Sequence, residues 1–200
     1  SKYEYDAFGN RVRKQAGTKN IHYHYNVANQ LIREEGIFPE QSYQYDGRGN
    51  LTAVLYGLEE VNQYTYDETN RLTGGLNNKG QAAKYQYDGL GNRIGKQEFT
   101  VSDLKSGNRR QLETILMEQP DREVDYLLDL TRNYHNLLEK TEITGKSVDS
   151  QTYVWDNSVA FMTEREYTHI FLQDELGSTV RLSEIQEKQQ TIYGLSLIHI

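Results

Sequence analysis

The sequence predicts an all-β fold made of stacked antiparallel β-hairpin repeats, and three observations predict it. Tyrosine dominates the aromatic content, with 16 Tyr against 5 Phe and 1 Trp. Tyr suits a sheet surface, where its ring packs while its hydroxyl stays in water. A short motif of two tyrosines followed by Asp or Asn recurs every 20 or 21 residues. Each copy runs into a segment of Gly and Asn residues, which favour turns.

The motif occurs five times in the first half of the chain. The copies are Tyr3-Glu4-Tyr5-Asp6, Tyr23-His24-Tyr25-Asn26, Tyr43-Gln44-Tyr45-Asp46, Tyr64-Thr65-Tyr66-Asp67 and Tyr85-Gln86-Tyr87-Asp88. Their second tyrosines are 20, 20, 21 and 21 residues apart. A regular period of this length indicates a repeat architecture in which each unit is one supersecondary element.

Two kinds of turn alternate after the motif. Three copies carry Gly-Asn, in Asp6-Ala7-Phe8-Gly9-Asn10, Asp46-Gly47-Arg48-Gly49-Asn50 and Asp88-Gly89-Leu90-Gly91-Asn92. The other two, Asn26-Val27-Ala28-Asn29-Gln30 and Asp67-Glu68-Thr69-Asn70-Arg71, use a lone Asn and are expected to be one residue shorter. In both kinds the first Asp or Asn is expected to bond the backbone ahead of it, and the Gly or later Asn to take positive φ.

Alternation along each strand sorts the side chains onto two faces. Tyr3 and Tyr5 share one face, while Glu4 points to the other. A single hairpin cannot bury its tyrosine face, since an isolated two-stranded ribbon is marginal in water, so neighbouring repeats must stack. The predicted aromatic ladders consist of Tyr3, Tyr5, Tyr23, Tyr25, Tyr43, Tyr45, Tyr64, Tyr66, Tyr85 and Tyr87.

The pattern loosens in the second half of the chain but persists. Tyr153-Val154-Trp155-Asp156 keeps the aromatic pair before Asp, and Asp174 and Gly177 keep the three-residue spacing of Asp6 and Gly9. The next aromatic at the repeat position after Gln173 is Tyr193, a step of 20. The array is therefore expected to enter a further unit there.

The organisation follows from these intervals. The 39 residues between Tyr87 and Tyr126 amount to about two units, and are expected to hold one blurred repeat and a polar insertion from Ser102 to Asp121, with a helical turn over 112–117. The prediction is regular repeats over 1–99, a degenerate repeat with a loop insertion over 100–123, and divergent repeats over 124–194. Residues 195–200 resemble translated sequencing adapter and are left out of the fold prediction.

Together these segments resemble the YD-repeat, or Rhs, family of large secreted and cell-surface bacterial proteins, to which Tc-toxin C components and teneurins are also similar. The resemblance covers Tyr3 to about Gly194 and is most specific in the five repeats and in 125–138 and 173–178. It implies a sheet wound spirally into a hollow shell that, in toxin members, encloses a C-terminal toxic domain. In many members the shell ends at an Asp-Pro motif where an aspartate-dependent self-cleavage frees the toxin. Phe38 and Gln119 precede the two Pro here, so neither the motif nor a toxin domain is expected in this chain.

Composition excludes several classes of function. A net charge of −7 argues against a nucleic-acid partner, which needs a concentrated basic face. The absence of Cys from the sequence removes disulfides, thiolate zinc sites and thiol catalysis. No run approaches the roughly 20 apolar residues that a membrane-spanning helix needs.

Three groups of side chains suggest chemistry, and each has a plainer explanation. The first is a possible calcium ladder of repeated Asp, but calcium rolls repeat about every nine residues, and a turn accounts for each Asp. The second is a pair of glycosidase carboxylates, for which closeness in sequence does not set the required separation across a cleft. The third is a two-histidine metal site, which lacks a third ligand. The residues concerned are Asp6, Asp46, Asp67 and Asp88; Asp125 with Asp129 and Glu164 with Glu166; and His22 with His24.

The predicted site residues are therefore structural, with no catalytic, cofactor or metal residue among them. They are Tyr5, Asp6, Gly9, Asn10, Tyr25, Asn29, Tyr45, Asp46, Gly49, Asn50, Tyr66, Asp67, Asn70, Tyr87, Asp88, Gly91, Asn92, Asp174 and Gly177. The leading hypothesis is a secreted or cell-surface shell segment whose partners are the rest of its shell and an enclosed toxin domain. The alternative is an adhesive repeat that binds glycans or another surface protein through exposed Tyr and Trp155. A hidden glycosidase is a third, weaker hypothesis.

Overall fold

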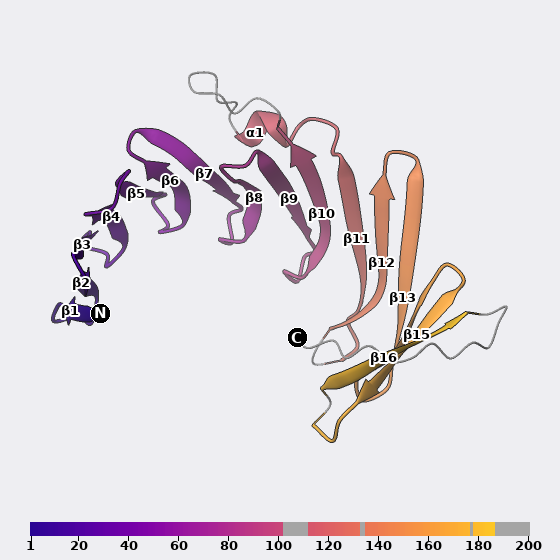
Figure 1. The fold of residues 1–200 in the computed structure, drawn as a ribbon. Helices are drawn as coiled ribbons and strands as arrows, with labels where there is room; N and C mark the ends of the chain where they lie inside the picture. Colours follow the sequence, from indigo (N-terminus) through magenta and orange to yellow (C-terminus); the bar gives the residue numbers. More distant parts are fainter. Residues whose placement is uncertain (102–111, 133–134, 177, 187–200) are drawn as a thin grey trace. The chain divides into compact units, whose positions relative to one another are not determined.

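The structure is a computed structural model that describes residues 1–101, 112–132, 135–176 and 178–186. Within these residues it is all-β, and its strands are hydrogen-bonded in chain order from β1 to β16 (Figure 1). The strands of the first half are β1 Lys2–Tyr5, β2 Arg11–Ala16, β3 Lys19–Tyr25, β4 Leu31–Glu35, β5 Gln41–Tyr45, β6 Leu51–Tyr56, β7 Glu59–Tyr66, β8 Leu72–Leu76, β9 Gln81–Tyr87 and β10 Arg93–Thr100. Those of the second half are β11 Arg122–Asp129, β12 Asn136–Thr144, β13 Ser147–Trp155, β14 Val159–Glu164, β15 Tyr167–Gln173 and β16 Thr179–Gln186.

The chain divides into two compact units, which we describe separately. Unit 1 comprises Ser1–Tyr85 with Glu98–Gln119, and unit 2 comprises Gln86–Gln97 with the residues from Pro120 onward. The strand pairs described within each unit are antiparallel and join neighbours in sequence, as expected for stacked hairpins. The predicted fold class is thus confirmed.

A β-bulge ends the first four motifs and three of their divergent equivalents. The register shifts between the two residues that precede the turn Asp or Asn, at Glu4/Tyr5, His24/Tyr25, Gln44/Tyr45, Thr65/Tyr66, Leu127/Leu128, Val154/Trp155 and Leu172/Gln173. A bulge bends its strand and re-aims one side chain. The recurrent bulge therefore places the residue before each of these turns, aromatic in five of the seven, in the same local setting.

The turns at the other ends of the strands are mostly short. Two-residue connections begin at Gly17, Gly57, Gly145 and Arg165, each with φ between 53° and 64°. Positive φ at the first central residue is what tight hairpins require, because such turns match the twist of the strands. The long repeat thus alternates a five-residue motif turn with a tight turn.

One sequence prediction about the turns is wrong. The lone-Asn turns have the same length as the Gly-Asn turns: Asn26 N donates to Gln30 O at 3.0 Å just as Asp6 N donates to Asn10 O at 2.9 Å. Asn29 (φ 59°) simply replaces Gly9 (φ 84°), because Asn tolerates the left-handed region.

The interval between the turns at Asp88 and Asp129 is described in part. Its described residues hold β10, β11 and one helix, α1 Leu112–Ile115, so the predicted helical turn is present. Residues 102–111 of the predicted insertion lie outside the described residues, and the blurred repeat stays a prediction.

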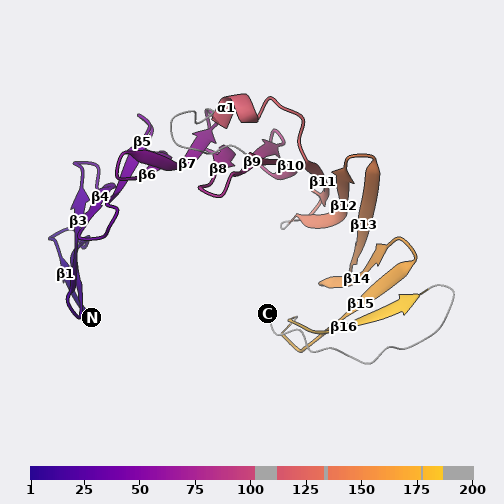
Figure 2. The ribbon, with the colours of Figure 1, turned by 45° about the horizontal axis from the view of Figure 1, so that its top comes forward.

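The principal apolar cluster lies in unit 1, where α1 lies beside β8 (Figures 1 and 2). Leu112 and Ile115 of α1 are 3% and 1% exposed, and they pack with Leu76, Ala82 and Phe99. We call the side of each unit's sheet that carries the motif tyrosines or their equivalents the aromatic face and the other side the opposite face. No helix in the described residues is long and apolar enough to cross a membrane.

Candidate functional site

The best-defined recurrent site is the motif turn, in which one carboxylate closes the loop. In the third repeat Asp46 Oδ1 accepts hydrogen bonds from the backbone N–H groups of Arg48 and Asn50, each at 2.9 Å, while Asp46 Oδ2 accepts from Asn50 Nδ2 at 2.9 Å. Two backbone bonds complete the turn, from Asp46 N to Asn50 O and from Gly49 N to Asp46 O. We call this arrangement the Asx staple.

The same staple recurs with different partners at its last position. In the second repeat Gln30 takes the place that Asn50 has in the third, and its Oε1 accepts a hydrogen bond from Asn26 Nδ2 at 2.7 Å. In the fourth repeat Arg71 takes that place, and its Nε donates to Asp67 Oδ2 at 2.6 Å. Side-chain oxygens accept one or two backbone N–H groups ahead of them at Asp6, Asn26, Asp46, Asp67, Asn77, Asp88, Asp129 and Asp174. The staple therefore extends into the divergent half of the chain.

Hydrogen bonding keeps the staple carboxylates ionised. The Asn50 and Asn92 amides lower the pKa of Asp46 and Asp88, and the backbone N–H of Arg71 lowers that of Asp67. Because both oxygens of these carboxylates already accept hydrogen bonds, a cation would have to displace the turn to bind. The described residues contain no group of three or more metal-ligating side chains.

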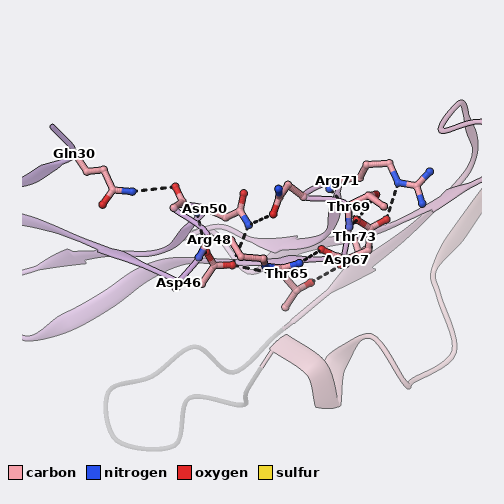
Figure 3. Close-up of polar contacts among 11 residues, drawn as sticks. Gln30, Asp46, Arg48, Asn50, Thr65, Asp67, Thr69, Arg71 and Thr73 are labelled. Atoms are coloured by element: carbon pink, nitrogen blue, oxygen red, sulfur yellow. Dashed lines mark hydrogen bonds and ion pairs between the residues drawn. The ribbon is translucent and has the colours of Figure 1, made fainter. Parts of the chain in front are cut away.

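Neighbouring staples in unit 1 are bonded to one another (Figure 3). Asn10 Nδ2 donates to Asn29 Oδ1 at 3.2 Å. Asn50 Nδ2 donates to Asn70 Oδ1 at 2.9 Å. Gln30 Nε2 donates to Gly49 O at 3.2 Å. These three contacts link the first four motif turns in chain order.

Arginine adds a second type of link between turns. Arg48 donates from its guanidinium to the backbone oxygen of Asp67 at 2.7 Å, and in unit 2 Arg132 does the same to Asp156 at 3.2 Å. His135 Nδ1 also lies 2.7 Å from Asn92 Oδ1. A line of turn-to-turn contacts is thus present in each unit.

The second aromatic of the motif links successive hairpins through the sheet. Tyr25 donates its hydroxyl to Arg11 O at 3.1 Å, and Tyr45 donates to Leu31 O at 2.9 Å. In both cases the acceptor is the first residue after the preceding motif turn. In unit 2 the same acceptor positions receive Trp155 Nε1 and Gln173 Nε2, at Leu137 O (2.6 Å) and Val159 O (2.8 Å). We call this contact the cross-repeat bond.

Charged groups also contribute to the aromatic face. The Arg11 guanidinium lies 4.3 Å from the centre of the Tyr23 ring and 5.9 Å from that of Tyr3, a favourable cation–π geometry. In unit 2 Glu142 pairs with Arg122 and Lys140, and these contacts, the Arg122 hydrogen bond above all, lower the pKa of Glu142 to about 2. Each of these carboxylates and cations is paired or stacked within its own unit.

The candidate metal site at His22 and His24 lies on the opposite face of unit 1. His24 Nε2 is 3.1 Å from Glu35 Oε2, and the strand partners of the two histidines include Arg13 and Arg33. Cationic neighbours disfavour a metal ion, and His24 is better explained by its contact with Glu35 on the exposed sheet surface.

The candidate carboxylate pairs have separate surroundings. Asp129 accepts hydrogen bonds from the backbone and hydroxyl of Thr131, whereas Asp125 lies in β11, where burial raises its pKa. Glu164 accepts from Gln151 at 3.2 Å, and Glu166 follows it in a tight turn. The described structure thus gives neither pair a shared cleft.

One open hollow of about 280 Å³ lies beside α1. Its lining is mixed, with Glu60, Gln63 and Glu113 among the polar side chains and Leu112 among the apolar ones. Gln63 is already engaged, since its Oε1 accepts from Leu112 N at 3.0 Å and its Nε2 donates to Glu60 at 3.1 Å.

The remaining predicted residues occupy the turns and strand ends assigned to them. Gly49, Asn70 and Gly91 have φ of 90°, 65° and 91°, and Tyr66 and Tyr87 are partly buried. Tyr5, in the first strand, is 61% exposed. Gly177, Tyr193 and residues 195–200 lie outside the described residues.

Sequence reasoning missed one staple and two kinds of contact. The staple at Asn77 closes onto Gln81, with Gly80 at φ 80°, but no tyrosine pair precedes it. The sequence placed Trp155 and Gln173 at the repeat position of the second tyrosine, but it did not predict their hydrogen bonds to the preceding repeat. The hydrogen bond of Arg48 to the next turn also left no signal in the sequence.

Comparisons with known proteins give a structural likeness alone. No family model and no curated protein matches the chain. The solved structures that resemble it include TcdB2-TccC3-Cdc42 (TM-score 0.47, 14% identity, 98% of this chain), the Photorhabdus luminescens Tc holotoxin pore (0.42, 14%, 93%) and TcdB2-TccC3 without its hypervariable C-terminal region (0.43, 16%, 92%). The chain spans 12–13% of the length of these chains. Similarity at this level carries no functional information.

Proposed function

We propose that this chain is a structural wall, a stretch of repeat sheet that carries out no chemistry of its own. The observation that carries the proposal is the double linkage between successive hairpins, through bonds between neighbouring staples and through the cross-repeat bond of Tyr25, Tyr45, Trp155 and Gln173. Because these polar groups already form hydrogen bonds between repeats, they favour a structural role over a reactive site.

We further propose that the wall belongs to an Rhs or YD-repeat shell that is secreted or displayed at the surface of a bacterium. Its partners are then the rest of its own shell and a toxin domain enclosed at the C-terminal side. The motif resemblance is what supports this finer assignment.

The complete reading frame tests the shell assignment. A shell protein should encode a conserved terminal motif and a short variable domain after these repeats, with an immunity gene next to it. In limited proteolysis of the full-length protein, that variable domain should resist protease until the repeats are denatured. A variable domain cleaved as fast as when it is expressed alone would contradict enclosure.

A second candidate is surface adhesion, favoured by an exposed aromatic side chain inside the array, Tyr167 of β15, which is 38% exposed on the aromatic face of unit 2. Aromatic faces of this kind can bind glycans or proteins. Wall anchors or a membrane segment in the reading frame, together with a glycan-array signal that Tyr167→Ser abolishes, would favour this function. Turnover of a glycoside by the full-length protein would contradict both structural roles.

A further inference from the structure

The connection between β4 and β5 differs from the two connections beside it in unit 1. Those neighbours are two-residue turns that begin at Gly17 and Gly57, whereas residues 36–40 join β4 to β5. Gly36 leaves the strand with a φ of 91°, and Pro39 has no backbone N–H to donate to a strand ladder. The pairing of these two strands therefore stops early.

The ladder between β4 and β5 is short as a result. The two strands are paired at two positions, Arg33 with Ser42 and Glu34 with Gln41. By comparison, β3 pairs with β4 at four positions and β5 pairs with β6 at five. We call the boundary between β4 and β5 the seam.

Burial contributes little to the seam. All residues of β4 and β5 are described, and none of them is buried. Buried side chains lie one strand away on either side, Tyr23 on β3 and Val54 on β6. Because removal of apolar surface from water is the dominant favourable term in folding, parting the seam exposes little that would oppose it.

Polar side chains hold the seam closed instead. Tyr43 of β5 donates its hydroxyl to Glu34 Oε1 of β4 at 2.7 Å. A hydrogen bond to a carboxylate is about twice as strong as one between neutral groups, so we call this contact the clasp. Further contacts across the seam are Tyr45 with Leu31, Gln30 with Gly49 and Arg33 with Glu40.

The two ends of the connecting segment are attached to different sides of the seam. Gly36 lies against β3, since a Cβ on it would collide with Asn20 O. Glu40 is bonded to the turn after β6, because its backbone oxygen accepts a hydrogen bond from Gly57 N at 2.7 Å. Phe38, between these two points, is fully exposed. Short segments of this kind absorb the changes in φ and ψ when two bodies move relative to each other.

We propose that the seam is a hinge at which β1 to β4 swing as one body away from the remaining strands of unit 1, with residues 36–40 as the joint. Opening breaks two ladder positions and a few side-chain contacts, and it leaves the pairs β2–β3 and β5–β6 intact. Regions with few buried apolar contacts open at a lower free energy than the whole fold. The hinge does not depend on the proposed shell role.

Hydrogen exchange of the complete chain, read at single amides by mass spectrometry with fragmentation, tests the hinge. Amides that donate across the seam should exchange at least tenfold faster than those between β2 and β3 or between β5 and β6. Tyr43→Phe should speed exchange at the seam about tenfold more, because it removes the clasp and keeps the ring. Glu34→Gln should act in the same direction with a smaller effect, because it keeps an acceptor but removes its charge.

Tyr153→Phe is the matched control. Its hydroxyl donates to Gln151 on its own strand at 3.0 Å, as that of Tyr43 also does to Gln41 at 3.1 Å, but it has no equivalent of the clasp among its described contacts. Exchange at the seam should be the same in this variant as in the unaltered chain. Exchange between β6 and β7, together with circular dichroism, verifies that each variant keeps its fold.

Two results for the unaltered chain would overturn the hinge. Seam amides as slow as those between β5 and β6 would show that the seam stays closed. A single common rate for the seam and for the amides between β2 and β3 would show that these strands unfold together and do not swing as one body. Equal exchange at the seam in Tyr43→Phe and Tyr153→Phe would contradict the clasp.

Discussion

At the residue scale, one oxygen-bearing side chain at the end of each motif determines the turn. Asp46 accepts two backbone N–H groups and one side-chain amide, which are groups that the turn would otherwise leave without partners. Gly or Asn then supplies positive φ three residues later. The pairing of these two features explains why Asp-x-x-Gly and Asn-x-x-Asn are interchangeable here.

The need for positive φ at Gly91 can be tested separately from the general effect of replacing a glycine by alanine. Gly91 has φ 91°, whereas Gly89 in the same turn has no positive φ and would have no atom within 4 Å of an added Cβ. Gly91→Ala should destabilise the chain by about 1–2 kcal/mol, the cost of an L-residue in that region. Chemical denaturation monitored by circular dichroism measures this. Gly89→Ala is the control, and an equal loss in both variants would contradict the turn assignment.

The staple carboxylates make the stability of the fold depend on pH. The folded-state pKa of Asp46 and Asp88 is depressed, so their contribution is present above the ordinary value near 4 and is lost as pH falls through the lower folded value. Asp46→Asn with Asp88→Asn should therefore lower the melting temperature at pH 7 and flatten its decline between about pH 4 and 2.

Asn26 offers the reverse substitution, since it already fills the same role as an amide. Asn26→Asp should steepen the loss of melting temperature in acid. Parallel melting-temperature curves for all three proteins would show that the staples do not govern acid stability.

At the scale of the hairpin, the bulge and the cross-repeat bond act together. The bulge falls just before the second aromatic, and that side chain then reaches the first carbonyl after the previous turn. Tyr45 thus stabilises a neighbour and not its own hairpin.

Tyr45→Phe should cost about 0.5–1.5 kcal/mol, because it removes one hydrogen bond and leaves the Leu31 carbonyl without its donor. Tyr5→Phe is a matched control, since the Tyr5 side chain is 61% exposed and its hydroxyl makes no hydrogen bond in the described residues. Urea denaturation of both variants compares them. A loss in Tyr5→Phe as large as that in Tyr45→Phe would count against the cross-repeat bond.

The seat of α1 depends on Gly74, one of two adjacent glycines in β8 that face opposite sides of the sheet. A Cβ on Gly74 would meet Leu116 Cδ1 at 2.5 Å and Thr65 Oγ1 at 2.7 Å, but one on Gly75 would have its nearest contact at 3.6 Å. Gly74→Ala should therefore destabilise unit 1 by about 1–3 kcal/mol through overpacking, and speed amide exchange of Leu116. Gly75→Ala should be neutral or slightly stabilising. Identical behaviour of the two variants in hydrogen exchange would contradict the seat.

The sequence predicts the elements that repeat and misses those that occur once. The period of the tyrosine motif is enough to predict strands and turns up to Asp88, because each copy repeats the same local chemistry. The Asn77 staple was missed because Leu76 and two glycines precede it in place of tyrosines. The contact of α1 with Gly74 was missed because it joins residues far apart in the chain, and a period carries no information about such contacts.

At the scale of the whole molecule, each hairpin contacts its sequence neighbours, as in other repeat arrays, where stability is a sum of unit and neighbour terms. Within this 200-residue chain β1 pairs with β2 alone. Tyr3 and Tyr5 in β1 are 46% and 61% exposed, whereas the equivalent Tyr23 is 6% exposed. The aromatic face is thus least protected at β1.

The 200-residue chain should associate through this edge, because an unpaired strand with exposed aromatic side chains is a template for pairing with another chain. Sedimentation velocity should show species whose size grows with concentration. Thermal denaturation should show a broad transition. Tyr3→Lys with Tyr5→Lys should suppress the association, since edge lysines oppose strand pairing and the exposed rings contribute little to stability. Phe8→Lys is the control, because Phe8 is 81% exposed but lies in the turn and not on the strand. A chain that stays monodisperse and melts cooperatively, or an equal effect of the Phe8 substitution, would show that the edge of β1 does not drive association.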